Sequence, residues 1–144
     1  LTNLQGRSIG LELPGYGVRP VRENEIGACN AICRQSHGYD RSQELEEAIA
    51  AGTARLVEHE SRVLGYATVI GFRGHAVAET NQALKALIAA AGEFAGTGFI
   101  LPSRNSELLH WCLSKGLRIV QQMTYMSLGM YREPKGCFLP SILA

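Results

Sequence analysis

The stretch from Gly98 to Gly129 places the tightest constraint on the fold, because it contains the signals of a strand and a capped helix in close succession. Phe99 to Leu101 is a short apolar run, and Pro102 ends it because proline has no N–H to donate to a sheet. Asn105 is a favourable N-cap, and the apolar residues after it recur at spacings of three and four. These signals predict a strand followed directly by a helix that begins around Asn105.

The second half of the same stretch shows where this helix ends. Lys115 carries the positive charge that the C-terminus of a helix favours, and Gly116 can adopt the left-handed conformation that ends a helix. Residues 117–130 are rich in Val, Ile, Met, Thr and Tyr, and Gln121 and Gln122 mark a break among them. We therefore expect the helix to end at Lys115, and one bent strand or two short strands to follow.

The composition is that of one globular domain. A chain of 144 residues with 46% hydrophobic and 19% charged residues can bury one substantial core. A formal net charge of +1 gives no reason to expect affinity for nucleic acid or for an anionic membrane. No apolar run approaches the roughly 18 residues of a membrane span. With four cysteines and no signal peptide pattern, we expect reduced thiols in a cytoplasmic protein.

The N-terminal region has the character of a linker. Residues 1–17 begin with Leu rather than Met and are rich in glycine around Pro14. We expect them to be a linker or the tail of a preceding element, and residues 18–144 to form the domain. A preceding domain in the same chain, or a second copy in a homodimer, would then be the partner.

The middle of the chain predicts alternating helices and strands. The expected elements are a strand over 18–21, a helix that presents Ile26, Cys29, Ile32 and Cys33 and ends at Gly38, a helix over 42–51, a hairpin of strands 53–59 and 63–72, and a helix from about Val77 or Thr80 to Ala91. We expect Arg41 and Arg62 in solvated turns, Trp111 in half-buried packing, and an apolar irregular tail over 131–144 that packs on a neighbour.

This chain resembles the GNAT superfamily of N-acetyltransferases. In that family an Asn opens the helix after the splayed strand that holds the cofactor, and a Gly-Phe pair closes it about eleven positions on. Asn105 and Gly116-Leu117 stand at this spacing here. The resemblance covers roughly residues 18–130. It implies an α/β (α+β) fold with a mixed, mostly antiparallel central sheet flanked by about four helices.

The resemblance also implies acetyl-CoA as co-substrate and a place where it binds. The family holds the cofactor pyrophosphate on backbone N–H groups at a helix N-terminus, a natural anion site. The corresponding residues here are Arg73, Gly74, His75, Ala76, Val77 and Ala78, and Asn105 would contact the pantetheine arm. That arm would pass between the strand ending at Phe72 and the strand 99–101. The alternative is a simple strand-to-helix turn with Thr80 as its N-cap.

Proton transfer has several candidates. The family's general acid is a Tyr seven positions after the helix-opening Asn, and Cys112 stands there, where it fits a buried core position better. Tyr125 or a water could supply the proton instead. Glu79 or His75 at the loop, or Glu58 or His59 on the preceding strand, could relay the proton that the amine loses. Of these candidates we take Glu79 and Tyr125 as the predicted catalytic residues.

A metal site is the remaining chemical candidate. Cys29, Cys33 and His37 follow one another at four-residue steps, as soft ligands on one helix would. No fourth ligand is evident, so we interpret the cysteines as core residues and expect no metal.

Two classes of function follow from the resemblance. The first is an acyl-CoA-dependent N-acyltransferase, in which a small-molecule or peptide amine attacks the thioester directly. The second is a GNAT-fold domain that has lost catalysis and serves binding, regulation or dimerisation. Arg73 and Asn105 favour the first class, whereas Ala76 and Cys112 favour the second.

Overall fold

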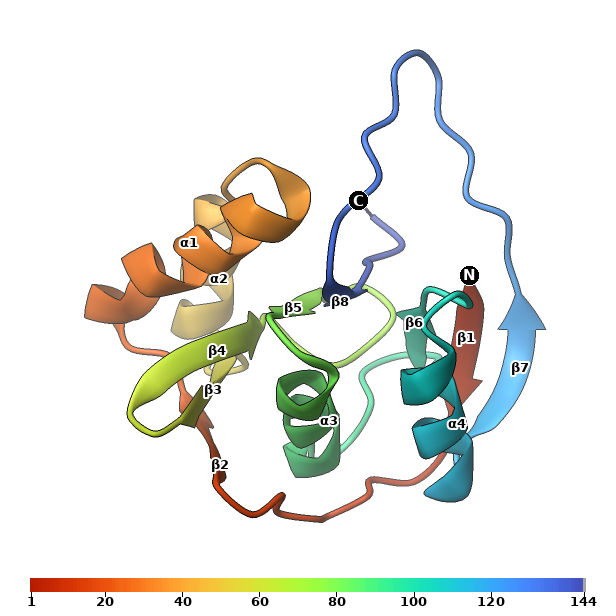
Figure 1. The fold of residues 1–144 in the computed structure, drawn as a ribbon, viewed down its shortest axis with the longest axis horizontal. Coiled ribbons are helices and arrows are strands. Elements are labelled where there is room, and N and C mark those ends of the chain that lie inside the picture. The colour runs from red at the N-terminus through yellow and green to blue at the C-terminus, as the bar shows by residue number, and fades with distance from the viewer. Residues whose placement is uncertain (144) are drawn as a thin grey trace.

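The computed structural model describes residues 1–143 and confirms a mixed α/β fold, with four α-helices and antiparallel strand pairing in those residues (Figure 1). In chain order, the elements are β1 (Thr2–Gln5), β2 (Tyr16–Pro20), the 3-10 turn η1 (Glu23–Glu25), α1 (Ile26–His37), α2 (Ser42–Ala50), β3 (Arg55–His59), β4 (Arg62–Ala67), β5 (Ala76–Ala78), α3 (Asn81–Ala90), β6 (Phe99–Leu101), α4 (Ser106–Ser114), β7 (Arg118–Gln122) and β8 (Cys137–Leu139). None of the helices in this part of the chain has the length and apolar character needed to cross a lipid bilayer.

The strands form two sheets. The larger has the order β2-β3-β4-β5-β8, and the smaller has the order β6-β1-β7. Side chains on neighbouring positions of the larger sheet enter two different cores, as the alternation of a strand requires. Leu56, Tyr66 and Val77 pack with α1 and α2, whereas Val57 and Ala67 pack in the core that contains α3 and α4. The larger sheet is therefore covered by helices on both faces (Figure 1).

Several predicted helix boundaries are confirmed. Helix α1 ends at Gly38, whose φ of 86° is left-handed, and α4 begins after Asn105, whose side chain accepts a hydrogen bond from the Leu108 N–H (3.4 Å). Thr80 is the N-cap of α3, and its hydroxyl accepts from the Ala83 N–H at 3.2 Å. Trp111 is half-buried against the core, as expected.

The linker prediction is wrong for the first residues of the chain. Thr2–Gln5 form β1, which lies between β6 and β7 and pairs with both. Leu4 is fully buried, and the N-terminal amine of Leu1 donates to the Met123 carbonyl at 2.8 Å. The linker description fits only residues 6–15, which contain no helix or strand. A strand of four residues offers too little alternation to be recognised from sequence, and its partners lie about a hundred positions away.

The predicted strand over 63–72 is too long, and a strand was missed after it. Strand β4 ends at Ala67, and the following loop closes where the Thr68 N–H donates to the His75 carbonyl at 3.0 Å. Ala76–Ala78 then form β5, and α3 begins only at Asn81. The small residues of β5 suit a strand that is buried on both faces, where no polar alternation exists to reveal it.

Part of the C-terminal tail packs on its own domain. Its residues 137–139 form β8, which pairs with β5 through Ala76–Leu139, Val77–Phe138 and Ala78–Cys137. Phe138 and Leu139 are buried. The segment before β8 projects away from the body of the molecule (Figure 1), and it exposes Met126, Leu128 and Met130.

Candidate functional site: an aromatic pocket beside the expected cofactor cleft

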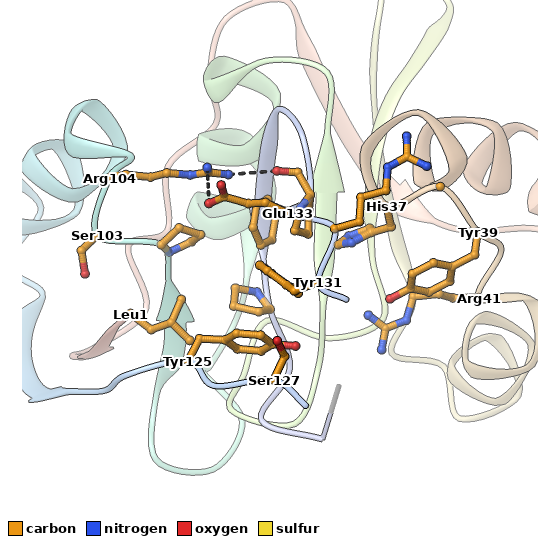
Figure 2. Close-up of a pocket in the computed structure, with 16 residues that line it drawn as sticks. Leu1, His37, Tyr39, Arg41, Ser103, Arg104, Tyr125, Ser127, Tyr131 and Glu133 are labelled. Atoms are coloured by element: carbon orange, nitrogen blue, oxygen red, sulfur yellow. Dashed lines mark hydrogen bonds and ion pairs between the residues drawn. The ribbon is translucent and has the colours of Figure 1, made fainter. Parts of the chain in front are cut away.

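A pocket of about 730 Å³ opens between the α1–α2 loop, the end of β6 and the segment that connects β7 to β8 (Figure 2). We call it the aromatic pocket. Its wall consists of aromatic rings, prolines and guanidinium groups, provided by His37, Tyr39, Arg41, Pro102, Arg104, Tyr125, Tyr131, Phe138 and Pro140 among others. Chain segments far apart in sequence therefore meet at one concave surface, which is the usual form of a small-molecule site.

The rings form pairs around the pocket. Tyr125 and Tyr131 lie with their ring centroids 5.0 Å apart, and His37 meets Phe138 edge-on at 5.5 Å. Both tyrosines are half-exposed, so their faces are accessible from the pocket. This arrangement gives a planar or apolar ligand several surfaces for stacking.

Arg41 is the most unusual residue of the pocket. Only 7% of its side chain is exposed, and its Nε and Nη2 groups donate to the Glu44 carboxylate at 2.9 and 2.8 Å. Figure 2 shows its guanidinium group on the side of the pocket opposite Arg104. The expectation of a solvated turn is wrong for Arg41, which is buried, and Arg62 is exposed as expected but begins β4 instead of lying in a turn. The signal in the sequence is the three-residue step from Arg41 to Glu44 at the start of a helix, which permits such a pair.

A buried polar chain continues from Glu44 into the core. The second carboxylate oxygen of Glu44 lies 3.2 Å from His75 Nδ1, and His75 Nε2 lies 3.0 Å from the Tyr66 hydroxyl. His75 Nδ1 has no hydrogen-bond partner among the described residues, so its approach to Glu44 is a close electrostatic contact rather than a hydrogen bond. The neighbouring His75 and Arg41 side chains lower the pKa of Glu44 to about 2. Burial lowers the pKa of His75, so its ring is held neutral.

His37 presents a neutral imidazole to the pocket. Burial, together with the nearby Arg41 charge, lowers the pKa of His37 to about 4. Its Nε2 atom is buried and has no hydrogen-bond partner among the described residues. A ligand in the aromatic pocket could supply this missing partner.

Arg104 is held in place on the other side. Its guanidinium group pairs with the Glu133 carboxylate, donates to the Pro134 carbonyl at 2.9 Å, and lies 5.9 Å from the centre of the Phe138 ring (Figure 2). The aromatic pocket thus combines two fixed guanidinium groups, neutral imidazole and phenol groups, and apolar walls. This combination can bind an amphipathic anion.

The predicted pyrophosphate segment has its backbone N–H groups already in use. The Gly74 N–H donates to the Gly71 carbonyl at 3.2 Å, and the His75 N–H donates to the Thr68 hydroxyl at 3.1 Å. Residues 76–78 lie inside the ladders with β4 and β8. The Arg73 side chain is exposed on the preceding turn. The segment is a strand rather than the N-terminus of a helix, so it lacks the free amides that hold a phosphate.

The space expected for the pantetheine arm is also occupied. The strand next to it is β5, not a strand ending at Phe72, and β8 pairs along the β5 edge on that side while also contacting β6. At the ends of β5 and β6, Asn105 and Asn81 exchange two side-chain hydrogen bonds of 2.8 and 3.0 Å. Asn105 therefore lies where the resemblance places it, but its amide is already satisfied by Asn81.

The two predicted catalytic residues are not brought together. Tyr125 lines the aromatic pocket, whereas Glu79 lies beyond the end of β5, outside that pocket, in an ion pair with Arg62. The alternative bases are engaged elsewhere as well. Glu58 pairs with Arg19, and His59 Nδ1 lies 2.7 Å from the Gly15 carbonyl oxygen. His75 is buried behind Arg41 and Glu44, away from solvent.

The cysteines behave as core residues. Cys29, Cys33 and Cys112 are fully buried, and burial raises the pKa of Cys29 and of Cys112 to about 12. These thiols therefore stay protonated and unreactive at neutral pH. Among residues 1–143, no three His, Cys, Asp or Glu side chains are grouped in a way that could hold a metal ion.

Comparison with known proteins adds information on the fold. No protein-family model and no curated protein sequence matches the chain. A solved structure of a mutant of TTHA1254 from Thermus thermophilus is similar, with a TM-score of 0.53 and 17% identity, over 81% of this chain and 99% of that chain. At this level of identity the likeness shows a shared fold and nothing about activity.

Proposed function

We propose that this domain is a GNAT-like binding module that holds a small ligand in the aromatic pocket and does not transfer acyl groups. The observation that carries the proposal is the pairing of β8 with β5, because it fills the cleft in which the resemblance places the pantetheine arm. Leu139 and Phe138 anchor this strand in the two cores, so it is part of the fold rather than a loose end. Opening the cleft would require both side chains to leave their cores.

The bonded backbone amides and the residue at the family's acid position support the same proposal. Acyl transfer needs donors for the pyrophosphate and an acid for the departing thiolate. The amides of residues 74–78 are already bonded, and the residue at the family's acid position, Cys112, is fully buried. Each function that the resemblance assigned to these positions is thus replaced by a structural one.

The pocket chemistry indicates the class of ligand. Arg41 and Arg104 provide guanidinium groups that are held in place by Glu44 and Glu133, and the Tyr125–Tyr131 pair and Phe138 provide apolar surface. A fixed guanidinium group is the preferred partner of a carboxylate, because its parallel N–H groups match the two oxygens. We therefore assign to the aromatic pocket a planar or aromatic carboxylate.

The experiment is a titration of the isotope-labelled protein with phenylacetate, followed by backbone amide NMR shifts. Phenylacetamide is the matched control ligand, since it has the same ring without the charge. We expect saturable shifts around the α1–α2 loop with phenylacetate, weaker shifts with phenylacetamide, and loss of binding in Tyr131→Ala and in Arg41→Gln. Tyr131 is half-exposed, so the first variant tests the site without disturbing the core.

Equal shifts with both ligands, or undiminished binding in both variants, would show that the pocket does not recognise a carboxylate.

An acyl-CoA-dependent N-acyltransferase is the second candidate, and one observation favours it. Asn105 and the N-terminus of α3 lie together at the ends of β5 and β6, where Asn81 joins them. Of the first amides of α3, that of Ala83 is capped by Thr80, whereas those of Asn81 and Gln82 have no partner within the helix and could receive an anion. This candidate needs β8 to leave the β5 edge when acetyl-CoA binds. Binding of acetyl-CoA itself therefore separates the two candidates.

A further inference from the structure

A second pocket, of about 740 Å³, lies at the other end of the β6-β1-β7 sheet. The aromatic pocket includes Leu1 and Pro102, at the start of β1 and the end of β6. The second pocket is bordered by residues 5–8, after β1, and by residues 96–98, before β6. The two pockets are therefore separate sites at opposite ends of the same strands.

Three positive charges line this second pocket, which we call the basic pocket. Arg7 follows β1, Lys115 ends α4, and Arg118 begins β7. All three side chains are exposed, and none forms an ion pair within residues 1–143. No Asp or Glu lines the pocket in this part of the chain. Other cations of the described chain are also outside ion pairs, so what distinguishes Arg7, Lys115 and Arg118 is that they gather in one pocket that no carboxylate lines.

The helix dipole explains only one of the three charges. Lys115 stands at the C-terminus of α4, where a cation is favourable without any ligand. Arg7 lies in an irregular segment and Arg118 at the start of a strand, so a helix dipole does not explain the position of either charge. Like charges that gather in a concave space raise its potential and attract an anion.

Two exposed glycines that line the basic pocket leave open space for that anion. A side-chain carbon at Gly116 would meet no atom within 4 Å, and one at Gly96 would meet only the Phe72 side chain at 3.6 Å. One polar part of the pocket is formed by Gln5 and Thr97. The Gln5 side-chain amide donates to the Thr97 carbonyl at 2.7 Å. Phe94, half-buried beside them, adds one apolar surface.

We propose that the basic pocket binds a small, multiply charged phosphate compound. Two guanidinium groups and one ammonium group suit a pyrophosphate or a phosphate ester, because each phosphate offers several oxygens to such donors. A nucleic-acid duplex fits less well, since it would require a continuous basic stripe, whereas the chain has a net charge of only +1. This site does not depend on the function proposed for the aromatic pocket.

Calorimetric titration of the whole chain with inorganic pyrophosphate tests the site, with inorganic phosphate and sulfate for comparison. We expect pyrophosphate to bind more tightly than phosphate or sulfate, and the affinity to fall as the salt concentration rises. Arg7→Gln and Arg118→Gln should each weaken pyrophosphate about tenfold. Arg55→Gln is the matched control, because it removes one exposed charge outside the pocket and should change nothing.

Melting temperatures of the three variants verify that they are folded. The proposal is overturned if millimolar pyrophosphate gives no heat of binding, or if Arg55→Gln lowers the affinity as much as the pocket variants do. A short DNA duplex that binds more tightly than pyrophosphate, and loses affinity in Arg7→Gln, would replace the proposal with a nucleic-acid surface.

Discussion

Arg41 shows how one buried charge can organise a site. A guanidinium group removed from water is costly unless it is paired, and here Glu44 provides that pairing from the next helical turn. Glu44 in turn lies 3.2 Å from His75 Nδ1, and His75 Nε2 lies 3.0 Å from the Tyr66 hydroxyl. The charge at the pocket wall is therefore fixed by a chain of contacts that runs into the core.

The two histidines near Arg41 make stability depend on pH. In the unfolded chain a histidine takes up its proton near pH 6.5, whereas folded His37 resists protonation until about pH 4. The unfolded state then binds more protons between these values, so stability is complete above pH 6.5 and falls as the pH drops. His75 shifts in the same direction. The pKa of Glu44 is lowered to about 2, so its contribution to stability is complete at neutral pH and is lost only at more acidic pH than the histidine effect.

We expect the free energy of unfolding, measured in urea, to be lower at pH 5.0 than at pH 7.5. One histidine can contribute at most about 1.4 kcal/mol per pH unit. His37→Asn should reduce this pH dependence, because it removes one of the two groups. Equal stability at both values, or an unchanged difference in His37→Asn, would show that these imidazoles are not held neutral by the fold.

At the scale of elements, β8 determines whether the edge of β5 is free or covered. It has three residues, and it fills the position beside β5 with one side chain in each core. If β8 is a fixed part of the fold, its contacts contribute to global stability. If β8 could detach from β5 while the rest of the domain stayed folded, these contacts would contribute little to global stability.

Leu139→Ala measures this contribution. Leu139 is 3% exposed and packs in the core that contains α3, so we expect a loss of about 2–4 kcal/mol in the free energy of unfolding. Leu128→Ala is the matched control, since Leu128 is fully exposed on the projecting segment and the same substitution should change stability by less than about 0.5 kcal/mol. Similar small effects in both variants would mean that β8 is not docked in solution.

The elements also show what sequence patterns can reveal. Helices α1 and α4 could be predicted because apolar spacing, caps and terminal glycines all agree over nine or more residues. Strands β1, β5 and β8 have only three or four residues each, too few for a period of two to appear. Each is defined by distant partners, which no local pattern contains.

For the whole molecule, this difference determines how much of the site could be foreseen. The N-cap position of Asn105 could be predicted from the sequence, but the closed cleft and the aromatic pocket that contains Tyr125 could not. It depends on a contact between residues 76–78 and 137–139. The burial of Arg41 depends in the same way on packing between the α1–α2 loop and the loop that carries His75.

We propose that, in the complete molecule, structural contacts replace the cofactor site that the GNAT resemblance implies. The most direct test is calorimetric titration of the chain with acetyl-CoA, with adenosine as reference. We predict no saturable binding up to millimolar acetyl-CoA. In a melting experiment, we also predict that acetyl-CoA raises the melting temperature no more than adenosine does. Saturable binding, with stabilisation approaching about 2.7 kcal/mol at a hundred times the dissociation constant, would contradict the proposal and favour the N-acyltransferase.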